Sequence, residues 1–227
     1  MSKIAIITGA SSGIGRSLSI DLAEIGYRVV LVSRSDKKLQ AVSNKILEKG
    51  GECLTISADI SIPNEIKKIK KEASSFGDVS LVVNNAGVGK FDKIEDITLD
   101  DWNFQIDVNL RGSFLISQAF IPNMKKIKRG TLVFINSVAG KQAYPYSSVY
   151  VSTKHALRGL ADSMREELRK DNIKVISIYP GAVNTPFWND TGTNFPMEEM
   201  LKVENVSKSI VNAIEAPDNC TVEEMLI

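Results

Sequence analysis

Short runs of apolar, mostly β-branched residues alternate along this chain with longer stretches of helical periodicity. Such alternation is typical of strand–helix–strand units, in which parallel strands form one sheet that helices cover on both faces. The sequence therefore predicts an α/β fold. No repeat, low-complexity tract or linker divides it, so residues 1–227 are expected to form one domain. The expected strands are Lys3–Thr8, Arg28–Ser33, Cys53–Ser57, Leu81–Asn84, Thr131–Ser137, Lys174–Tyr179 and Val222–Leu226.

Glycine and capping residues mark where the helices between these strands begin and end. Gly26 and Gly50 follow helical segments and are expected to end them in a left-handed conformation. Ser61 precedes a proline by two residues and is expected to cap the next helix. Thr98 with Asp101 resembles a capping box, which predicts a further helix start.

The charge balance argues against binding to polyanions. The chain has 28 basic and 27 acidic residues, a net charge of +1, whereas proteins that bind nucleic acids or membrane surfaces carry a clustered excess of Lys and Arg. The basic runs Lys67–Lys71 and Lys125–Arg129 are each interrupted by isoleucine, as on the exposed face of an amphipathic helix. We therefore expect a protein that binds neither nucleic acid nor membrane.

Histidine and cysteine are too scarce for a zinc site, so no metal is expected. The chain holds one histidine, His155, and two cysteines, Cys53 and Cys220, which are expected to stay reduced and to pack inertly. The apolar stretch near residue 4 is too short for a signal peptide, and no segment approaches the ~20 apolar residues of a membrane-spanning helix. These features predict a soluble, cytoplasmic protein.

A glycine-rich turn follows the first expected strand and leads directly into a helix. Its sequence from Thr8 to Arg16 is TGASSGIGR, with the spacing GxxxGxG. Glycines permit a tight turn and a close approach of the backbone, and the first turn of a helix points unpaired N–H groups at an anion. The turn is therefore expected to bind the phosphates of a dinucleotide. The candidate contacts are Gly9, Ser11, Ser12, Gly13, Ile14 and Gly15.

The end of the second expected strand indicates which dinucleotide is bound. Ser33 ends this strand without a carboxylate and Arg34 follows, although Asp36 lies close by. In dinucleotide-binding folds an acid at this place bonds the ribose 2′-hydroxyl of NAD, whereas an arginine accommodates the 2′-phosphate of NADP. The sequence thus favours NADP(H), with NAD(H) as the alternative.

Polar residues at the ends of two other strands are expected to line the same crevice. Asp59 follows the third strand, and the residues from Asn84 to Gly87 (NNAG) follow the fourth. In a doubly wound sheet the crevice opens at the carboxyl ends of the strands, where the direction of the connections reverses. Such residues are also suited to ordinary caps, so their binding role depends on the glycine turn beside them.

Tyr150 and Lys154 are four residues apart in an expected helix and therefore lie on one helical face. A free phenol has a pKa of about 10, and a nearby ammonium lowers it toward the neutral range in which proton transfer is most efficient. Tyr150 is thus a candidate general acid or base that needs no histidine. Ser137, at the end of the fifth strand, is placed to hold a substrate oxygen. His155 points about 100° away from Lys154 and has no expected role.

Taken together, these segments resemble the short-chain dehydrogenases/reductases, and in particular their NADP-preferring members. The resemblance covers nearly the whole chain and implies a Rossmann-type fold, a doubly wound, seven-stranded parallel sheet in the order 3-2-1-4-5-6-7 flanked by helices. It also implies NAD(P)-dependent interconversion of a carbonyl and an alcohol. The motifs that match in order and spacing are Thr8–Gly15, Asn84–Gly87, Asn109, Ser137, Tyr150 with Lys154, and Pro180–Thr185.

The resemblance assigns roles to residues by their position. Tyr150 is implied to be the general acid/base, Ser137 to orient the substrate oxygen, and Lys154 to bind the nicotinamide ribose and lower the pKa of the tyrosine. Asn109 is implied to distort its helix and to support a water relay to Lys154. Ser33 and Arg34 resemble the residues that NADP-preferring members carry at this place. Ser12, however, stands where some of those members carry a basic residue. The remaining implied cofactor contacts are Asp59 at the adenine, Asn85 and Gly87 at the adenosine ribose, and Val183 and Thr185 at the nicotinamide carboxamide, with Ile60, Ala86, Pro180 and Gly181 in the same segments.

Residues 186–202 lie where this family keeps its substrate lid. Their aromatic and apolar side chains are expected either to cover the substrate or to fill core or a subunit contact. The facing wall is expected from the loop Val138–Tyr146, in which Lys141 is a candidate partner for a substrate carboxylate and is equally suited to face water. The apolar lid residues are Phe187, Trp188, Phe195 and Met197, with Gly192 and Pro196 as candidate hinges.

The leading expectation is an NADPH-dependent carbonyl reductase that acts on a small molecule, in which Tyr150 protonates the oxygen held by Ser137. One alternative is a 3-oxoacyl thioester reductase, for which Lys125–Arg129 would have to offer a basic patch to an acidic carrier protein. Another is a non-catalytic NADP(H)-sensing protein, since a fold alone does not establish function. By resemblance, helices over Asp100–Ile121 and Val149–Lys170 are expected to pack in a homodimer or homotetramer.

Overall fold

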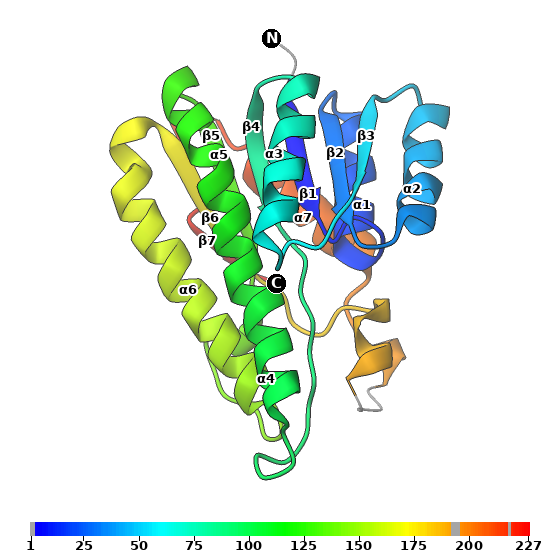
Figure 1. Ribbon diagram of the computed structural model, residues 1–227, viewed down its shortest axis with the longest axis vertical. Helices are drawn as coiled ribbons and strands as arrows, with labels where there is room; N and C mark the ends of the chain where they lie inside the picture. The colour runs from blue at the N-terminus through cyan, green and yellow to red at the C-terminus, as the bar shows by residue number, and fades with distance from the viewer. Residues whose placement is uncertain (1–2, 192–195, 218) are drawn as a thin grey trace.

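The structure is a computed structural model that describes residues 3–191, 196–217 and 219–227. A seven-stranded parallel sheet in the order β3-β2-β1-β4-β5-β6-β7 forms its centre, with helices on both faces (Figure 1). The predicted α/β fold and its strand order are therefore confirmed. The strands are β1 (Ile4–Thr8), β2 (Arg28–Ser33), β3 (Cys53–Ser57), β4 (Val79–Asn84), β5 (Gly130–Ile135), β6 (Ile173–Tyr179) and β7 (Glu224–Leu226).

The clearest difference from the predicted strands is at the end of β5. The sequence predicts a strand through Ser137, but β5 ends at Ile135. The backbone N–H of Ser137 donates to Oδ1 of Asn136 at 3.0 Å and not to a neighbouring strand, and a 3-10 turn over Val138–Gly140 follows. The β7 strand is also shorter than predicted, and β4 starts earlier, at Val79.

The helices cover the two faces of the sheet in two groups, because strand side chains alternate between the faces. Helices α1, α2 and α7 pack on one face, and α3, α5 and α6 pack on the other (Figure 1). The predicted helix Asp100–Ile121 is α4 and most of α5, joined by a π-helical segment over Ile106–Gly112. The helices are α1 (Gly13–Glu24), α2 (Asp36–Glu48), α3 (Pro63–Phe76), α4 (Leu99–Gln105), α5 (Ser113–Ile127), α6 (Ser148–Leu168) and α7 (Val203–Ile214).

Two of the three predicted kinds of helix signal are confirmed. Gly26 and Gly50 follow the ends of α1 and α2 with φ of 91° and 78°. The Thr98 hydroxyl accepts a hydrogen bond from the backbone N–H of Asp101 at 3.0 Å and caps α4.

The predicted cap at Ser61 is wrong. Helix α3 starts one residue later, and Ile62 is its N-cap. Both the backbone N–H and the hydroxyl of Ser61 donate to Oδ1 of Asp59, at 2.9 and 2.6 Å. The hydroxyl is thus already engaged by the preceding turn, since short polar side chains compete for local partners.

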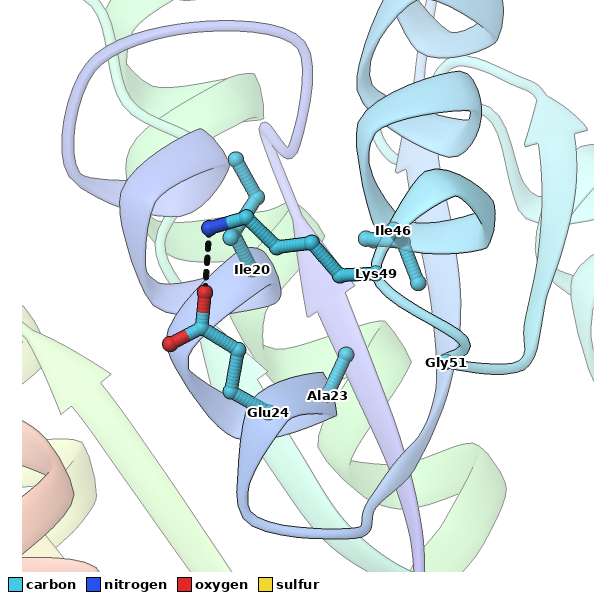
Figure 2. A pocket seen from close by; sticks show the side chains of 6 residues that line it. All are labelled: Ile20, Ala23, Glu24, Ile46, Lys49 and Gly51. Atoms are coloured by element: carbon cyan, nitrogen blue, oxygen red, sulfur yellow. Dashed lines mark hydrogen bonds and ion pairs between the residues drawn. The ribbon is translucent and has the colours of Figure 1, made fainter.

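Helices α1 and α2 contact each other near their C-terminal ends. Figure 2 shows the Lys49 side chain lying across their interface with its ammonium bonded to the Glu24 carboxylate. Beneath it, a Cβ placed on Gly51 would lie 2.8 Å from Cγ2 of Ile46, so this turn into β3 requires glycine.

The basic run on α3 lies as predicted, whereas Lys125 in the second run is half-buried and neither cysteine is fully buried, as the predicted packing would require. Lys67–Lys71 lie on α3 with the lysines exposed and Ile69 buried. Cys53 and Cys220 are both free thiols; Cys53 is half-buried and lies 3.1 Å from the Ser43 hydroxyl, and Cys220 is exposed. Within the described residues, no helix is long and apolar enough to cross a membrane, and no group of three or more His, Cys, Asp and Glu side chains is placed to hold a metal ion.

Candidate active site

The glycine turn at the end of β1 adopts a backbone that only glycine tolerates well. Gly9 and Gly13 have φ of 66° and 51°, in the left-handed region. A Cβ on Gly9 would lie 2.8 Å from Nδ2 of Asn85, and one on Gly15 would lie 2.4 Å from the same atom. A Cβ on Gly13 would lie 3.1 Å from Cγ2 of Thr185. The turn is therefore packed against two further segments for which the sequence predicted a cofactor role.

Hydrogen bonds from Thr8 join this turn to the NNAG segment after β4. The Thr8 hydroxyl accepts the backbone N–H groups of Asn85 and Ala86 at 3.0 and 3.1 Å and donates to the carbonyl of Val83 at 3.2 Å. Nδ2 of Asn85 donates to the Thr8 carbonyl at 2.8 Å. The carboxyl ends of β1 and β4 thus form one rigid floor, where the crevice of a doubly wound sheet is expected.

Helix α1 begins at this floor with unpaired backbone donors. Its N-cap, Ser12, has extended backbone, and no side chain among the described residues caps the helix. Ser11 and Ser12 are half-buried beside the turn, and Ile14 packs partly on the core. The helix start therefore points free N–H groups into the crevice, as anion binding requires.

The predicted nucleotide-discriminating residues lie at the end of β2. Arg34 is exposed, forms no ion pair with any residue that the structure describes, and its guanidinium carbon is 5.9 Å from the centroid of the Phe104 ring. The Ser33 hydroxyl accepts a hydrogen bond from the backbone N–H of Ser35 at 3.3 Å.

At the end of β3, Asp59 accepts the two hydrogen bonds from Ser61, and Ile60 is buried against the π-helical segment.

Tyr150, Lys154 and Ser137 meet beyond the carboxyl end of β5. Tyr150 lies in the first turn of α6, and Nζ of Lys154 is 5.6 Å from the centroid of its ring. The Ser137 hydroxyl lies close enough to the Tyr150 phenol to favour its charged form. The Lys154 ammonium donates to the carbonyl of Ile135 at 2.9 Å. The sequence-predicted constellation is therefore assembled.

Burial shifts the pKa of both titratable groups in this constellation. It raises the pKa of Tyr150 to about 12, an effect that the nearby Ser137 hydroxyl partly offsets. It lowers the pKa of Lys154 to about 8. The predicted lowering of the Tyr150 pKa by Lys154 is not found, because the ammonium is bonded to a backbone carbonyl and desolvation of the phenol dominates. The phenol is thus protonated at neutral pH.

Asn109 lies within the π-helical segment Ile106–Gly112, so the helix is distorted at this residue, as the resemblance implied. Its Oδ1 accepts the backbone N–H of Val88 at 2.8 Å, and its Nδ2 donates to the Val88 carbonyl at 2.9 Å and to the Thr153 hydroxyl at 3.1 Å. Asn109 therefore ties the segment after β4 to α6, next to Lys154.

The segment after β6 closes the other side of the crevice. Val183 and Thr185 are buried, and Val183 pairs with Leu201 in a short parallel bridge. The N–H of Gly181 donates to the carbonyl of Ile227 at 2.9 Å, and the Pro180 carbonyl accepts the N–H of Val138 at 3.0 Å. The base of the predicted lid is therefore joined to the predicted nicotinamide side of the site.

An aromatic wall adjoins Tyr150, and of its residues the sequence did not indicate Phe91. The Phe91 ring is edge-on to the Tyr150 ring at 5.3 Å between centroids, and Phe187 lies 5.7 Å from Tyr150. Phe187 and Trp188 therefore face the site, whereas Pro196 and Met197 are exposed and Gly192 and Phe195 lie outside the described residues. Phe91 is in a loop after β4, where no periodicity marks a wall residue.

An open cleft of about 430 Å³ lies on the far side of Phe91. Three carboxylates and one ammonium line it, so its charge is negative. The lining residues are Lys90, Phe91, Asp92, Asp96, Ile97, Asp101, Asn189 and Thr191.

Asn136 is a second contributor that the sequence analysis did not single out. It is buried, and its Nδ2 donates to the backbone carbonyl of Lys154 at 3.1 Å, while its Oδ1 accepts the N–H of Ser137. It thus fixes the spacing between the two segments that carry the predicted catalytic residues. A polar residue inside an otherwise apolar strand run was the available signal.

Comparisons with known proteins agree with this arrangement. The sequence profile of the short chain dehydrogenases matches residues 3–194. A sepiapterin reductase of Chlorobaculum tepidum is 33% identical over 235 residues, which cover 100% of this chain and 96% of that protein. Two solved structures share 31% identity and 100% of this chain: an alcohol dehydrogenase of the archaeon Thermococcus sibiricus complexed with 5-hydroxy-NADP (TM-score 0.92, 96% of that chain) and a metagenomic short-chain oxidoreductase in complex with NADP (TM-score 0.89, 97%).

The agreement extends over nearly the whole chain. A profile match of this length, together with relatives covered almost end to end, places the protein among enzymes and not only within a fold. The chain belongs to the short chain dehydrogenase family of oxidoreductases.

Proposed function

We propose that this protein is an NADP(H)-dependent oxidoreductase that interconverts a carbonyl and an alcohol, with Tyr150 as general acid/base. The observation that carries the proposal is the placement of Tyr150 beside both the Ser137 hydroxyl and the buried ammonium of Lys154, at the mouth of the crevice. The names of the similar proteins, a sepiapterin reductase and an alcohol dehydrogenase, are consistent with chemistry at a carbonyl or alcohol carbon.

The residues around the crevice fit a dinucleotide. The glycine turn and the uncapped start of α1 offer backbone N–H groups to a pyrophosphate. Gly87 lies directly beside the ammonium, since a Cβ there would lie 3.8 Å from Nζ of Lys154. We therefore assign phosphate binding to Gly9–Gly15, the adenosine side to Asp59–Ile60 and Asn85–Gly87, and the nicotinamide side to Lys154 and Pro180–Thr185.

Arg34 supports NADP(H) over NAD(H). Its guanidinium is exposed at the end of β2 and has no ion-pair partner among the described residues. A guanidinium binds phosphate through a fork of donors, whereas no carboxylate ends β2 to bind a free 2′-hydroxyl. The NADP and 5-hydroxy-NADP complexes of the similar structures agree with this assignment.

The chemistry divides between the cofactor and the side chains. When bound, NADPH supplies a hydride to the carbonyl carbon. Ser137 holds the carbonyl oxygen, and Tyr150 gives it a proton. Burial keeps the phenol protonated at neutral pH, so Tyr150 is ready to donate a proton in the direction of reduction. Asn109 holds the segment beside Lys154, where we propose that it supports the water relay that reprotonates the site.

The acyl-carrier alternative needs a basic patch at the mouth of the site. Lys125–Arg129 lie at the end of α5, next to the amino end of β5 and thus at the opposite edge of the sheet (Figure 1).

The near-neutral charge supports a cytoplasmic enzyme with a small-molecule substrate and without nucleic-acid or membrane binding. We also propose a homodimer or homotetramer, on the basis of the family resemblance. A non-catalytic NADP(H) sensor would need the crevice but not the assembled Ser137, Tyr150, Lys154 and Asn109.

The deciding experiment follows the oxidation of NADPH and of NADH with a panel of neutral ketones and aldehydes, keto acids, ketoacyl thioesters and sepiapterin. We expect reduction of a small-molecule carbonyl compound with NADPH and much slower reduction with NADH. Tight NADPH binding without turnover of any substrate would overturn the proposal in favour of the sensor. Preferred turnover of ketoacyl thioesters would overturn the assignment of substrate class.

A further inference from the structure

Glu224 on β7 is bound by three groups from other segments. Its Oε2 accepts from Nζ of Lys141 at 2.7 Å, and its Oε1 accepts from the Tyr179 hydroxyl at 2.9 Å. Nε of Arg158 lies 4.0 Å from Oε1. The Lys141 ammonium also lies 4.1 Å from the centroid of the Tyr179 ring. Lys141 meets a carboxylate, as the sequence suggested for this residue, but the carboxylate belongs to this chain.

Lys141 ends the short turn that carries Ser137. The N–H of Gly140 donates to the Ser137 carbonyl at 2.8 Å, and the N–H of Lys141 donates to the Val138 carbonyl at 2.9 Å. A Cβ on Gly140 would lie 2.5 Å from Oδ1 of Asn136, so the turn has no room to shift against the end of β5. A displacement of Lys141 is therefore passed to Ser137 through a closed, tightly packed turn.

The same strand holds the segment that follows β6. The N–H of Ile227 donates to the Tyr179 carbonyl at 3.2 Å, and its carbonyl accepts from Gly181 at 2.9 Å. These backbone bonds do not depend on the Glu224 side chain. The Glu224 side chain joins the turn with Ser137 to β7, in addition to the backbone bond from Val138 to the Pro180 carbonyl. The segment with Gly181 is joined to the residues at the end of β7 by backbone bonds, so mutation of Glu224 separates the two contacts.

We propose that Glu224 is a positioning residue for the reaction: through Lys141 it holds the turn of Ser137 at the place where the substrate oxygen binds. This inference rests on the proposed function, because it concerns the same site. Lys141 holds the pKa of Glu224 below its ordinary value, so the carboxylate is ionised at neutral pH.

The ion pair of Glu215 with Lys3 is a matched control, and it lies at the amino-terminal ends of the strands. Glu215 accepts from the Tyr27 hydroxyl at 2.7 Å and from Nζ of Lys3 at 2.9 Å, and the Lys3 ammonium lies 5.1 Å from the centroid of the Tyr27 ring. The exposure of the two ion pairs is similar, 36%/36% for Lys3 and Glu215 against 30%/37% for Lys141 and Glu224. Lys3 and Tyr27 precede β1 and β2, at the amino ends of the strands and away from Ser137.

The experiment compares Glu224→Gln and Lys141→Met with Glu215→Gln in the full chain. Because exposed ion pairs contribute little to stability, we expect Tm values within a few degrees of one another for all three variants. We expect kcat for carbonyl reduction to fall roughly ten- to hundredfold in Glu224→Gln and Lys141→Met, since small misplacements of a positioned group have effects of this size. The Kd of NADPH should stay within about twofold, and Glu215→Gln should keep the wild-type kcat.

Two further measurements separate this inference from a general structural effect. The double variant of Lys141 and Glu224 should lose no more activity than either single variant, because both act through one contact. Amide hydrogen exchange at Val138–Gln142 should become faster in Glu224→Gln but not in Glu215→Gln.

Equal kcat values for Glu224→Gln and Glu215→Gln would overturn the inference, and so would additive losses in the double variant or unchanged exchange at Val138–Gln142. Absence of turnover in the wild-type protein would instead refute the proposed function. In that case the exchange comparison alone decides whether Glu224 holds the turn.

Discussion

The Lys154 ammonium donates a hydrogen bond to the backbone carbonyl of Ile135, with 2.9 Å between the nitrogen and the oxygen. Only 4% of Lys154 is exposed. The cation is thus buried against a neutral dipole at the end of β5 and not against a carboxylate. Desolvation is uncompensated by an opposite charge, which explains why burial lowers the pKa of Lys154 to about 8.

This arrangement predicts that Lys154 lowers the stability of the fold near neutral pH. Between its folded pKa of about 8 and its ordinary 10.5, the unfolded chain binds more protons than the folded one. Stability contributed by this group therefore rises with pH across that window, by up to about 3 kcal/mol, and is constant below it. Lys154→Met, which removes the charge, should unfold at higher urea concentration than the wild type at pH 7, while losing activity.

The measurement is the difference in free energy of unfolding between the two proteins from pH 7 to pH 10.5. Buried tyrosines titrate in both proteins, so their effect cancels in the difference. The advantage of Lys154→Met should shrink as the pH rises. If this difference does not vary with pH, burial of the charged Lys154 does not lower the stability of the fold.

Tyr150→Phe should bind NADPH as the wild type does and lose carbonyl reduction. The phenol donates the proton in the proposed reaction, and a positioned general acid contributes roughly 10²–10⁴-fold to the rate. The ring remains, so its packing against Phe91 and Phe187 is kept. NADPH fluorescence titration and steady-state kinetics check the two parts of this prediction. Tyr27→Phe, just before the amino-terminal end of β2, is the control. Undiminished carbonyl reduction by Tyr150→Phe would refute the mechanism.

Arg34→Ala should weaken the binding of NADPH by roughly 10- to 100-fold and leave that of NADH nearly unchanged. A hydrogen bond from a charged group contributes about 1.5–3 kcal/mol, and NADH lacks the 2′-phosphate that would receive it. Titration of both nucleotides gives the ratio. Lys45→Ala, in the last turn of α2, makes the same change in net charge elsewhere. Equal losses for the two nucleotides would exclude the 2′-phosphate role.

The order of strands and the assembly of the site were predictable because both depend on local patterns. The apolar runs indicate the strands, and a parallel sheet brings the carboxyl ends of β1, β4 and β5 together. A correct placement of the strands and helices is therefore enough to predict that four features lie close together: the glycine turn, Ser137, Tyr150 and Lys154. The resemblance to a known family supplied the sheet order and the role of Asn109, which periodicity alone does not indicate.

The features that were missed depend on side-chain competition and on burial. Ser61 was predicted to cap α3, but the carboxylate of Asp59 takes both of its donors. Phe91 became a wall residue only through the path of the loop after β4. The pKa of Tyr150 was expected to fall near a cation. Its rise follows from how deeply the phenol is enclosed, which helical spacing does not reveal.

Three glycine-to-alanine variants separate the effects that backbone strain, close packing and helix propensity have on stability. Gly26→Ala, at φ of 91° with nothing within 4 Å, should lower stability by about 1 kcal/mol through left-handed strain alone and leave NADPH binding intact. Gly159→Ala, on the open surface of α6, should raise stability by about 0.5–1 kcal/mol because alanine favours the helix.

Gly9→Ala combines the same strain with a collision, since its Cβ would lie 2.8 Å from Nδ2 of Asn85 and 2.9 Å from Cα of Ala86. It should destabilise the protein by more than Gly26→Ala. It should also weaken NADPH binding at least tenfold, because Asn85 and the turn must separate and the floor of the crevice opens. Urea unfolding and NADPH titration of the three variants give the comparison. Wild-type NADPH affinity in Gly9→Ala would mean that the glycine turn does not bind the nucleotide, and would remove the main support for the proposed cofactor site.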